Sequence, residues 1–145
     1  MSTVTDPKTI LVVDDDRVIL KALSTGLTAQ GFTVFTAQER SEALAVTRGS
    51  RPDLIVIDVN FPCEVGHGSG GWDGLALMSW IRQLFGSIPV IVISGAQTDD
   101  IKERAKTAGA LRFFQKPVNI GELLAAIDEA LTAHSIQEGA ARNFE

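Results

Sequence analysis

The chain of 145 residues has one cysteine, no long apolar run and no excess of positive charge. The single Cys63 excludes an internal disulfide, and no segment approaches the roughly 20 apolar residues of a membrane-spanning helix. Eighteen acidic residues against thirteen basic ones give a net charge of −5, which argues against nucleic-acid binding as the main function. The first residues also lack the apolar segment of a signal peptide. We therefore expect a cytoplasmic domain without membrane contact.

What the sequence does contain is an alternation of short apolar runs with amphipathic stretches. The run Leu54–Ile57 is apolar throughout and ends at Asp58, the form of a strand buried on both faces. Five strands alternating with five helices predict an α/β three-layer sandwich, with a parallel sheet covered on both faces. The predicted strands are 9–13, 32–37, 53–58, 90–93 and 111–115, and the predicted helices are 17–30, 39–48, 74–85, 99–108 and 120–133.

Local signals predict where the helices begin and end. Asp16 and Asn119 are expected N-caps of the first and last helices. Gly31, Gly49 and Gly109 are expected to stop the helices that precede them. The core-facing residues that we expect in the third helix are Leu75, Met78, Ile81, Leu84 and Phe85, and those in the last helix are Leu123, Leu124, Ile127 and Leu131.

We divide the chain into a lead-in of residues 1–8, one domain of residues 9–133 that contains a long loop at 59–73, and a C-terminal tail of residues 134–145 that is either fraying helix or irregular chain. No internal repeat or low-complexity segment interrupts the domain.

Polar side chains follow four of the predicted strands. Asp14 and Asp15 end the first strand, Asp58 the third, Ser94 the fourth, and Lys116 follows the fifth. Because parallel strands end at the same edge of a sheet, these side chains are expected to lie together. Three carboxylates repel one another and favour a hard cation with oxygen ligands, such as Mg²⁺. A carboxylate beside a metal, an ammonium and a hydroxyl describes a phosphoryl-accepting site.

With these motifs in this order, the chain resembles the receiver domain of a bacterial two-component response regulator of the chemotaxis-regulator type. The similarity covers roughly residues 9–131 and implies a flavodoxin-like (βα)5 fold with strand order 2-1-3-4-5. The matching segments are Ile10–Asp16, Asp53–Asp58 with Asn60 and Pro62, Asp73–Gly74, Val90–Gly95, Gly109–Ala110 and Phe114–Pro117.

The resemblance implies a role for each residue at the strand ends. Asp58 matches the phosphoacceptor, which receives a phosphoryl group from a phosphohistidine of a histidine kinase or phosphotransfer domain. Mg²⁺ would be held by Asp14, Asp15, Asp58 and the backbone carbonyl of Asn60. Lys116 matches the lysine that pairs with the phosphoryl oxygens, and the Lys116–Pro117 bond is usually cis in this family.

The resemblance also implies how phosphorylation is read out. Ser94 matches the residue that turns toward the bound phosphoryl group, and Phe113 matches the aromatic side chain that follows this turn. The surface expected to change is formed by the fourth helix, the fifth strand and the fifth helix. This surface would contact an unknown downstream target or a second copy of the chain, and not nucleic acid directly.

Two other functions use the same residues. A degenerate receiver would act as a docking module independent of phosphorylation, but none of the acidic residues nor Lys116 is lost. A Mg²⁺-dependent phosphohydrolase of the haloacid dehalogenase type needs an acid two positions after its nucleophile. Asn60 stands there and cannot transfer a proton, so we expect a phosphoacceptor and not an enzyme that turns over external substrates.

The chain departs from the family pattern between Pro62 and Asp73. Residues 63–72, which include four glycines and Trp72, replace what is normally a short link. This insertion either controls access to the site and contacts a specific partner, or is a surface insertion that loops tolerate at small cost. Cys63, Glu64 and His67 within it are weak as a transition-metal site, because few ligands are spread over a glycine-rich loop.

Deleting residues 64–71 separates these two interpretations. If the insertion gates the site or contacts a partner, the deletion changes the rate of phosphorylation or the choice of kinase. Both are measured with purified kinases and with a small phosphoryl donor. If neither value changes, the segment is a tolerated insertion only.

Overall fold

The structure, a computed structural model, describes residues 7–59, 74–95 and 99–143, with residues 134–143 as backbone only. Within these residues, five parallel strands alternate with five helices. The strands are β1 (Thr9–Val13), β2 (Thr33–Ala37), β3 (Leu54–Asp58), β4 (Val90–Ser94) and β5 (Arg112–Gln115). The helices are α1 (Arg17–Ala29), α2 (Arg40–Ser50), α3 (Gly74–Phe85), α4 (Asp99–Thr107) and α5 (Ile120–Asn143).

The sheet has the order β2-β1-β3-β4-β5, and every neighbouring pair is parallel. This confirms the predicted α/β fold and strand order. All residues of β3 and β4 are buried, because each strand has neighbours on both sides and helices on both faces. Parallel strands in one sheet all end at the same edge, so Asp14, Asp58, Ser94 and Lys116 are carried to one side of the domain.

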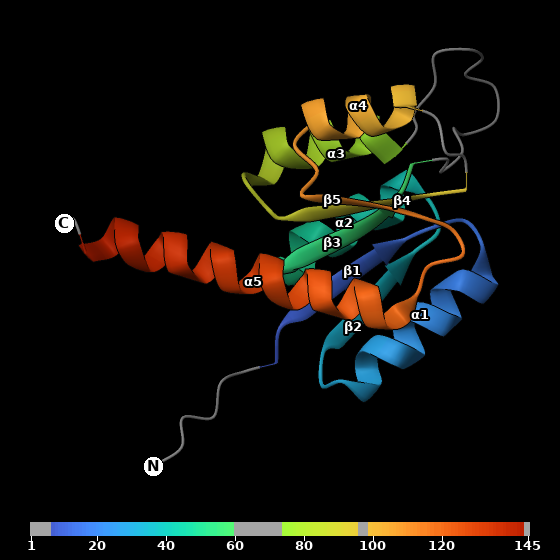
Figure 1. Ribbon diagram of the computed structural model, residues 1–145, viewed down its shortest axis with the longest axis horizontal. Helices are drawn as coiled ribbons and strands as arrows, with labels where there is room; N and C mark the ends of the chain where they lie inside the picture. The colour runs from blue at the N-terminus through green and yellow to red at the C-terminus, as the bar shows by residue number, and fades with distance from the viewer. Residues whose placement is uncertain (1–6, 60–73, 96–98, 144–145) are drawn as a thin grey trace.

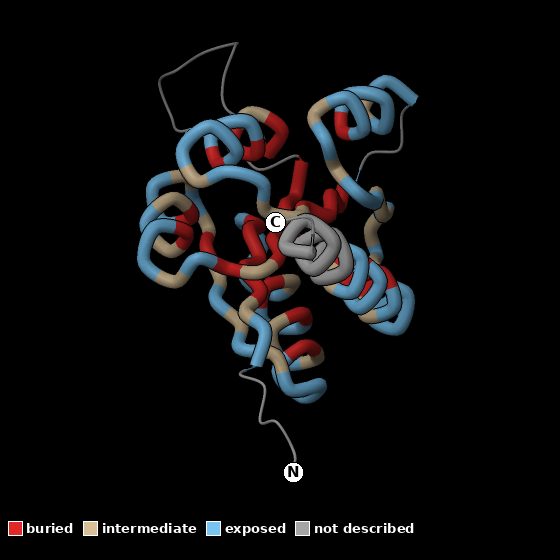
Figure 2. The backbone as a smooth tube through the Cα atoms, turned by 90° about the vertical axis from the view of Figure 1, so that its left-hand side faces the viewer, coloured by how far each residue is buried: buried red, intermediate tan, exposed pale blue. Residues whose placement is uncertain are grey.

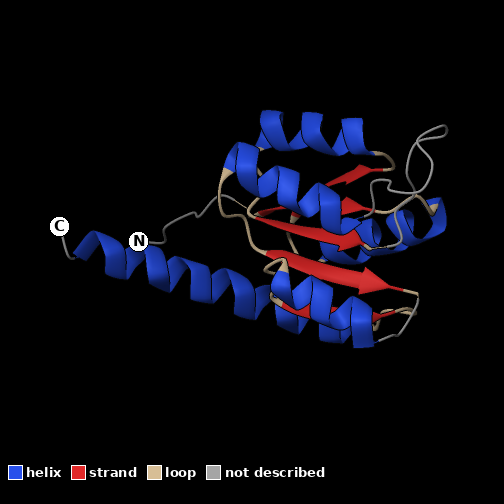
Figure 3. Ribbon diagram, turned by 90° about the horizontal axis from the view of Figure 1, so that it is seen from above, coloured by secondary structure: helices blue, strands red, loops and turns tan. Residues whose placement is uncertain are grey.

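The helices cover both faces of the sheet and form two separate cores (Figures 1 and 3). Leucines and isoleucines of α1 and α5 pack with Ile10, Leu54 and Ile91 on one face. Residues of α2, α3 and α4 pack with Leu11, Ile55 and Val92 on the other. Figure 2 shows the result, with buried residues in the strands and on the inner sides of the helices. No helix among the described residues combines the length and the hydropathy needed to cross a lipid bilayer.

Most predicted helix ends agree with the structure. The carboxylate of Asp16 accepts hydrogen bonds from the backbone N–H groups of Val18 and Ile19, so it caps α1. The side chain of Asn119 accepts a hydrogen bond from the N–H of Glu122 at 3.0 Å. Gly31 and Gly109 have φ values of 98° and 101°, the left-handed conformation that ends a helix. In α5, Leu123 and Ile127 are buried and Leu124 and Leu131 are partly buried, as predicted.

The predicted stop of α2 at Gly49 is wrong. The helix continues through Gly49 and ends at Ser50. Arg51 then takes the left-handed conformation, with φ 50°, and its N–H donates to the carbonyl of Thr47. Pro52 follows and disfavours a helical conformation at Arg51, so the stop comes from proline and not from glycine.

The core-facing stripe of α3 also differs from the prediction at one position. Leu75, Met78 and Ile81 are buried, but the Leu84 side chain is 54% exposed. Leu84 lies near the end of the helix, where the chain turns away at Gly86 toward β4. Leu77, which was not predicted to face inward, is buried instead.

Helix α5 continues to Asn143, so of the two forms expected for residues 134–145, helix is the one observed over most of the range. The division of the chain at residues 8 and 133 stays a prediction. The predicted long loop at 59–73 falls almost wholly outside the described residues.

Gly74 joins α3 to the end of β3. Its N–H donates to the carbonyl of Val59 at 3.2 Å, and this hydrogen bond ties together the two described ends of segment 60–73. A Cβ atom at this position would overlap the backbone carbonyl oxygen of Asp58 and would lie 2.6 Å from Cγ2 of Ile57. Glycine is therefore required here by close approach of the backbone.

We expect Gly74→Ala to lower the free energy of unfolding by about 1–3 kcal/mol, the usual cost of overpacking a core. Gly49→Ala is the matched control, because Gly49 lies inside a helix with open space around it. That substitution should stabilise the protein by about 0.5–1 kcal/mol. Urea denaturation measures both, and equal effects of the two substitutions would contradict the packing argument.

Candidate functional site

Four polar side chains meet at the edge where the strands end. Asp14 follows β1, Asp58 ends β3, Ser94 ends β4 and Lys116 follows β5. Asp14, Asp58 and Ser94 are buried. The backbone of Lys116 is held in place by β4, because its N–H donates to the carbonyl of Ser94 at 2.8 Å. The structure thus brings together the residues that the sequence predicted would meet.

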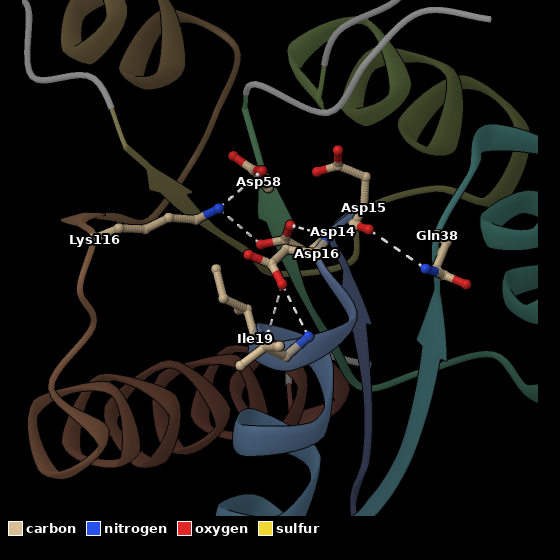
Figure 4. Close-up of polar contacts among 8 residues, drawn as sticks. Asp14, Asp15, Asp16, Ile19, Gln38, Asp58 and Lys116 are labelled. Carbon is tan, nitrogen blue, oxygen red and sulfur yellow. Dashed lines mark hydrogen bonds and ion pairs between the residues drawn. The ribbon is translucent and has the colours of Figure 1, made fainter.

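The centre of the site is the ammonium group of Lys116. Its Nζ atom lies 3.0 Å from Oδ2 of Asp58 and 2.9 Å from Oδ2 of Asp14 (Figure 4). One positive charge therefore faces two buried carboxylates that come from two different strands. The Lys116–Pro117 peptide bond is cis, as the family resemblance implied.

Asp14 is poorly satisfied in this arrangement. Its Oδ1 atom accepts a hydrogen bond from the N–H of Asp16 at 2.9 Å. Its Oδ2 atom is buried, and the one partner that it has among the described residues is the ammonium of Lys116, at 2.9 Å. Burial raises the pKa of Asp14 above its ordinary value, and the charge of Asp58 adds to this. The N–H of Asp16 and Lys116 oppose the rise without cancelling it.

The pKa of Lys116 is raised as well. Burial on its own would lower this pKa, but the hydrogen bonds and charges of Asp14 and Asp58 together outweigh burial. The ammonium therefore keeps its proton at physiological pH. A fixed positive charge of this kind attracts a phosphoryl oxygen or any other anion that enters the site.

The residues present fit a divalent cation. Carboxylate oxygens of Asp14, Asp15 and Asp58 all lie within 4.8 Å of one another. Three carboxylates beside a single ammonium leave an excess of negative charge, which a divalent cation would neutralise. Mg²⁺ prefers oxygen ligands and retains several waters, and the exposed side of Asp15 gives room for them.

The position of Asp15 depends on a residue that the sequence analysis missed. The side-chain amide of Gln38 donates to the backbone carbonyl of Asp15 at 3.4 Å (Figure 4). Gln38 follows β2, which lies beside β1 in the sheet. Its place after a strand that pairs with β1 is the only signal that could have identified it.

The two predicted switch residues lie on neighbouring strands. Ser94 comes directly after Ile93, which pairs with Asp58 across β3 and β4. Phe113 is partly buried against the core that α2, α3 and α4 share. It also lines a cavity of about 400 Å³ between α4 and β5. Asn60, the predicted carbonyl ligand, lies outside the described residues.

Comparison with known proteins gives a consistent result. The model of the response regulator receiver domain matches residues 10–128. The transcriptional regulatory protein PrrA of Mycobacterium tuberculosis is 36% identical over 128 residues, which cover 88% of this chain and 51% of PrrA. This chain thus spans about half the length of the curated relatives it matches.

Two solved structures are similar over most of the fold. A CheY-like receiver domain protein from Methanospirillum hungatei has a TM-score of 0.80 and 27% identity, covering 90% of this chain and 98% of that one. A response regulator protein from Burkholderia pseudomallei, crystallised with a phosphorylated aspartic acid, a calcium ion and citrate, has a TM-score of 0.72 and 25% identity. The match covers 92% of this chain and 74% of that one.

The raised pKa of Asp14 predicts how the metal-free protein responds to pH. A carboxyl group whose pKa is higher in the folded state than its ordinary value of 3.8 favours folding while it is protonated. Stability is lost as the pH rises from 3.8 through the raised folded pKa. We expect Asp14→Asn to lack this loss and to be more stable than the wild type at neutral pH without metal.

The reverse should hold with metal present, because Mg²⁺ stabilises only a protein that binds it. Adding Mg²⁺ should raise the unfolding midpoint of the wild type much more than that of Asp14→Asn. Urea denaturation at several pH values, with and without Mg²⁺, measures both effects. If metal-free Asp14→Asn were less stable than the wild type at neutral pH, the raised pKa of Asp14 would be contradicted.

Proposed function

Because the chain belongs to the family of response regulator receiver domains, we propose that it accepts a phosphoryl group on the carboxylate of Asp58. The donor is a phosphohistidine of a histidine kinase or a histidine phosphotransfer domain. The observation that carries this proposal is the position of Asp58. Its side chain is 2% exposed at the end of the central strand β3, and Lys116 Nζ lies 3.0 Å from it.

In the proposed reaction, a carboxylate oxygen of Asp58 attacks the phosphorus atom. A new P–O bond forms and the P–N bond to the donor imidazole breaks, and the imidazole leaves with the electron pair and takes up a proton. The product is an aspartyl phosphate. Phosphoryl transfer depends mainly on positioning and charge neutralisation. Lys116 supplies one fixed positive charge for the phosphoryl oxygens.

Asp14, Asp15 and Asp58 would hold Mg²⁺, together with the backbone carbonyl of Asn60. The bound cation would neutralise further charge on the phosphoryl oxygens. The phosphorylated aspartic acid and calcium ion in the Burkholderia pseudomallei protein support both parts of this proposal. The three carboxylates within 4.8 Å of one another, compensated by a single ammonium, support it from within the chain itself.

Phosphorylation of Asp58 would change the conformation of Ser94 and Phe113, and a partner would detect that change. A new dianion on Asp58 favours a hydrogen bond from the Ser94 hydroxyl. The cavity of about 400 Å³ beside Phe113 offers space for its ring to change rotamer. The face of α4, β5 and α5 is then the surface through which a downstream partner, or a second copy of the chain, detects the change.

Of the two alternative functions, only the docking module has a feature in its favour, the long insertion at residues 63–72. A docking module independent of phosphorylation needs no ammonium between two buried carboxylates, yet Lys116 is present and paired with both. Turnover of external substrates needs an acid two positions after Asp58, where the sequence has Asn60. The proposed chemistry is therefore confined to phosphorylation of the chain itself and slow hydrolysis of the aspartyl phosphate.

Incubation with acetyl phosphate and Mg²⁺ tests the proposal, with intact-protein mass spectrometry as the measurement. We expect the wild type to gain the mass of one phosphoryl group, and to gain none when EDTA replaces Mg²⁺. Asp58→Asn should gain none. Asp53→Asn, at the opposite end of the same strand, is the matched control and should gain the group as the wild type does. Equal labelling of Asp58→Asn would rule out Asp58 as the acceptor.

A further inference from the structure

Helix α3 exposes two large apolar side chains one turn apart. Trp80 is 43% exposed and Leu84 is 54% exposed. Residues four positions apart lie on the same side of a helix, so the two form one apolar strip. In the part of the chain that the structure describes, the other exposed large apolar residues occur singly, at Val18, Phe35, Leu111 and Ile120.

This strip faces away from α4. On the other flank of α3, Arg82 reaches α4 and donates to the carbonyl of Ala108 at 2.6 Å. Trp80 and Leu84 each lie about 160° around the helix from Arg82, since successive residues are about 100° apart. They therefore lie on the flank toward α2, the helix that packs beside α3 on the same face of the sheet (Figure 1).

The adjoining side of α2 is basic. Leu44 is partly buried against the core that α2 and α3 share, and Arg48 follows it one turn later on the same side. Arg51, directly after α2, places its guanidinium 5.9 Å from the ring centre of Phe85, at the end of α3. We define the α2–α3 patch as Leu44, Arg48, Arg51, Trp80 and Leu84.

The charge of this region is opposite to that of the whole chain. Residues 40–51 and 74–85 contain four arginines and one acidic residue, Glu42, in a protein with a net charge of −5. The carboxylate of Glu42 accepts a hydrogen bond from the N–H of Gln38 at 2.7 Å, before the start of α2. Of these arginines, Arg48 and Arg51 belong to the side of α2 that adjoins the strip, and α3 itself contains no acidic residue.

We propose that the α2–α3 patch docks an acidic amphipathic helix of a partner protein. Two apolar side chains at helical spacing match the apolar face of such a helix. Tryptophan and arginine are the residues that most often dominate binding energy at interfaces. Acidic side chains along the edges of the docked helix would pair with Arg48 and Arg51, and for this reason we expect the partner helix to be acidic.

A second copy of this chain is a poorer occupant. A two-fold interface places the same patch on both sides, so the arginines of one copy would face those of the other. Like charges brought together at an interface oppose association. The patch contains none of the residues of the proposed phosphoacceptor site, so peptide binding can be tested without phosphorylating Asp58.

The test uses the full chain labelled with ¹⁵N and two synthetic helical peptides of about 18 residues, long enough to hold helical structure. One peptide has a leucine strip bordered by glutamates, and the other has lysine in place of each glutamate. We expect the glutamate peptide to shift amide signals of residues 40–51 and 74–85, including the indole signal of Trp80. The lysine peptide should cause no such shifts, and added salt should weaken the binding of the glutamate peptide.

Variants make the test specific. Trp80→Ser combined with Leu84→Ser should lower the affinity for the glutamate peptide by about tenfold or more. Leu111→Ser is the matched control, because Leu111 is 52% exposed and lies off the patch. It should bind as the wild type does. Arg48→Glu combined with Arg51→Glu should reverse the preference, so that the lysine peptide binds. The dispersion of the amide spectrum shows that each variant is folded.

Three results would overturn the proposal. The first is equal binding of the two peptides, which would mean that the binding is non-specific. The second is the absence of peptide-induced shifts on α2 and α3. The third is self-association of the chain through residues 40–51 and 74–85, which would make a second copy the occupant.

Discussion

The bond on which this structure depends is the pairing of one ammonium with two buried carboxylates. Lys116 lies 2.9 Å from Asp14 and 3.0 Å from Asp58, and these residues come from three different strand ends. Removing Lys116 would leave two buried carboxylates without a compensating charge, and breaking a buried pair in this way typically costs about 3–5 kcal/mol. Strand order, burial and charge are therefore linked, because the observed order of strands places the lysine between the two acids.

The same arrangement separates apolar packing from charge. The strands β3 and β4 are buried along their whole length, and polar groups are found where they end. Gly74 extends this tight packing to the start of α3, directly against the backbone of Asp58. Asp58 is thus the last residue of a buried strand, and Asp14 and Lys116 directly follow strands, so the sheet holds these side chains in place.

The features of the fold and of the site that the sequence predicts are those that depend on residues close together in the chain. The apolar runs, the cap at Asp16 and the polar residues after the strands depend on neighbours in sequence, and all were predictable. The strand order needed the family resemblance. Gln38 was missed because its contact with Asp15 spans 23 positions. Gly49 was misassigned because Pro52 had the stronger effect. Leu84 was misassigned because periodicity does not show where a helix passes beyond the sheet.

The length of helix α5 would amplify a small change in its direction. It has 24 residues, which corresponds to a length of about 36 Å. In Figures 1 and 3 its far end projects beyond the sheet, whereas its first turn begins four positions after Lys116. Over this length, each degree of tilt at the base moves the far end by about 0.6 Å. A change in direction of about 5°, too small to disturb the packing near the base, would thus become a displacement of about 3 Å at Asn143.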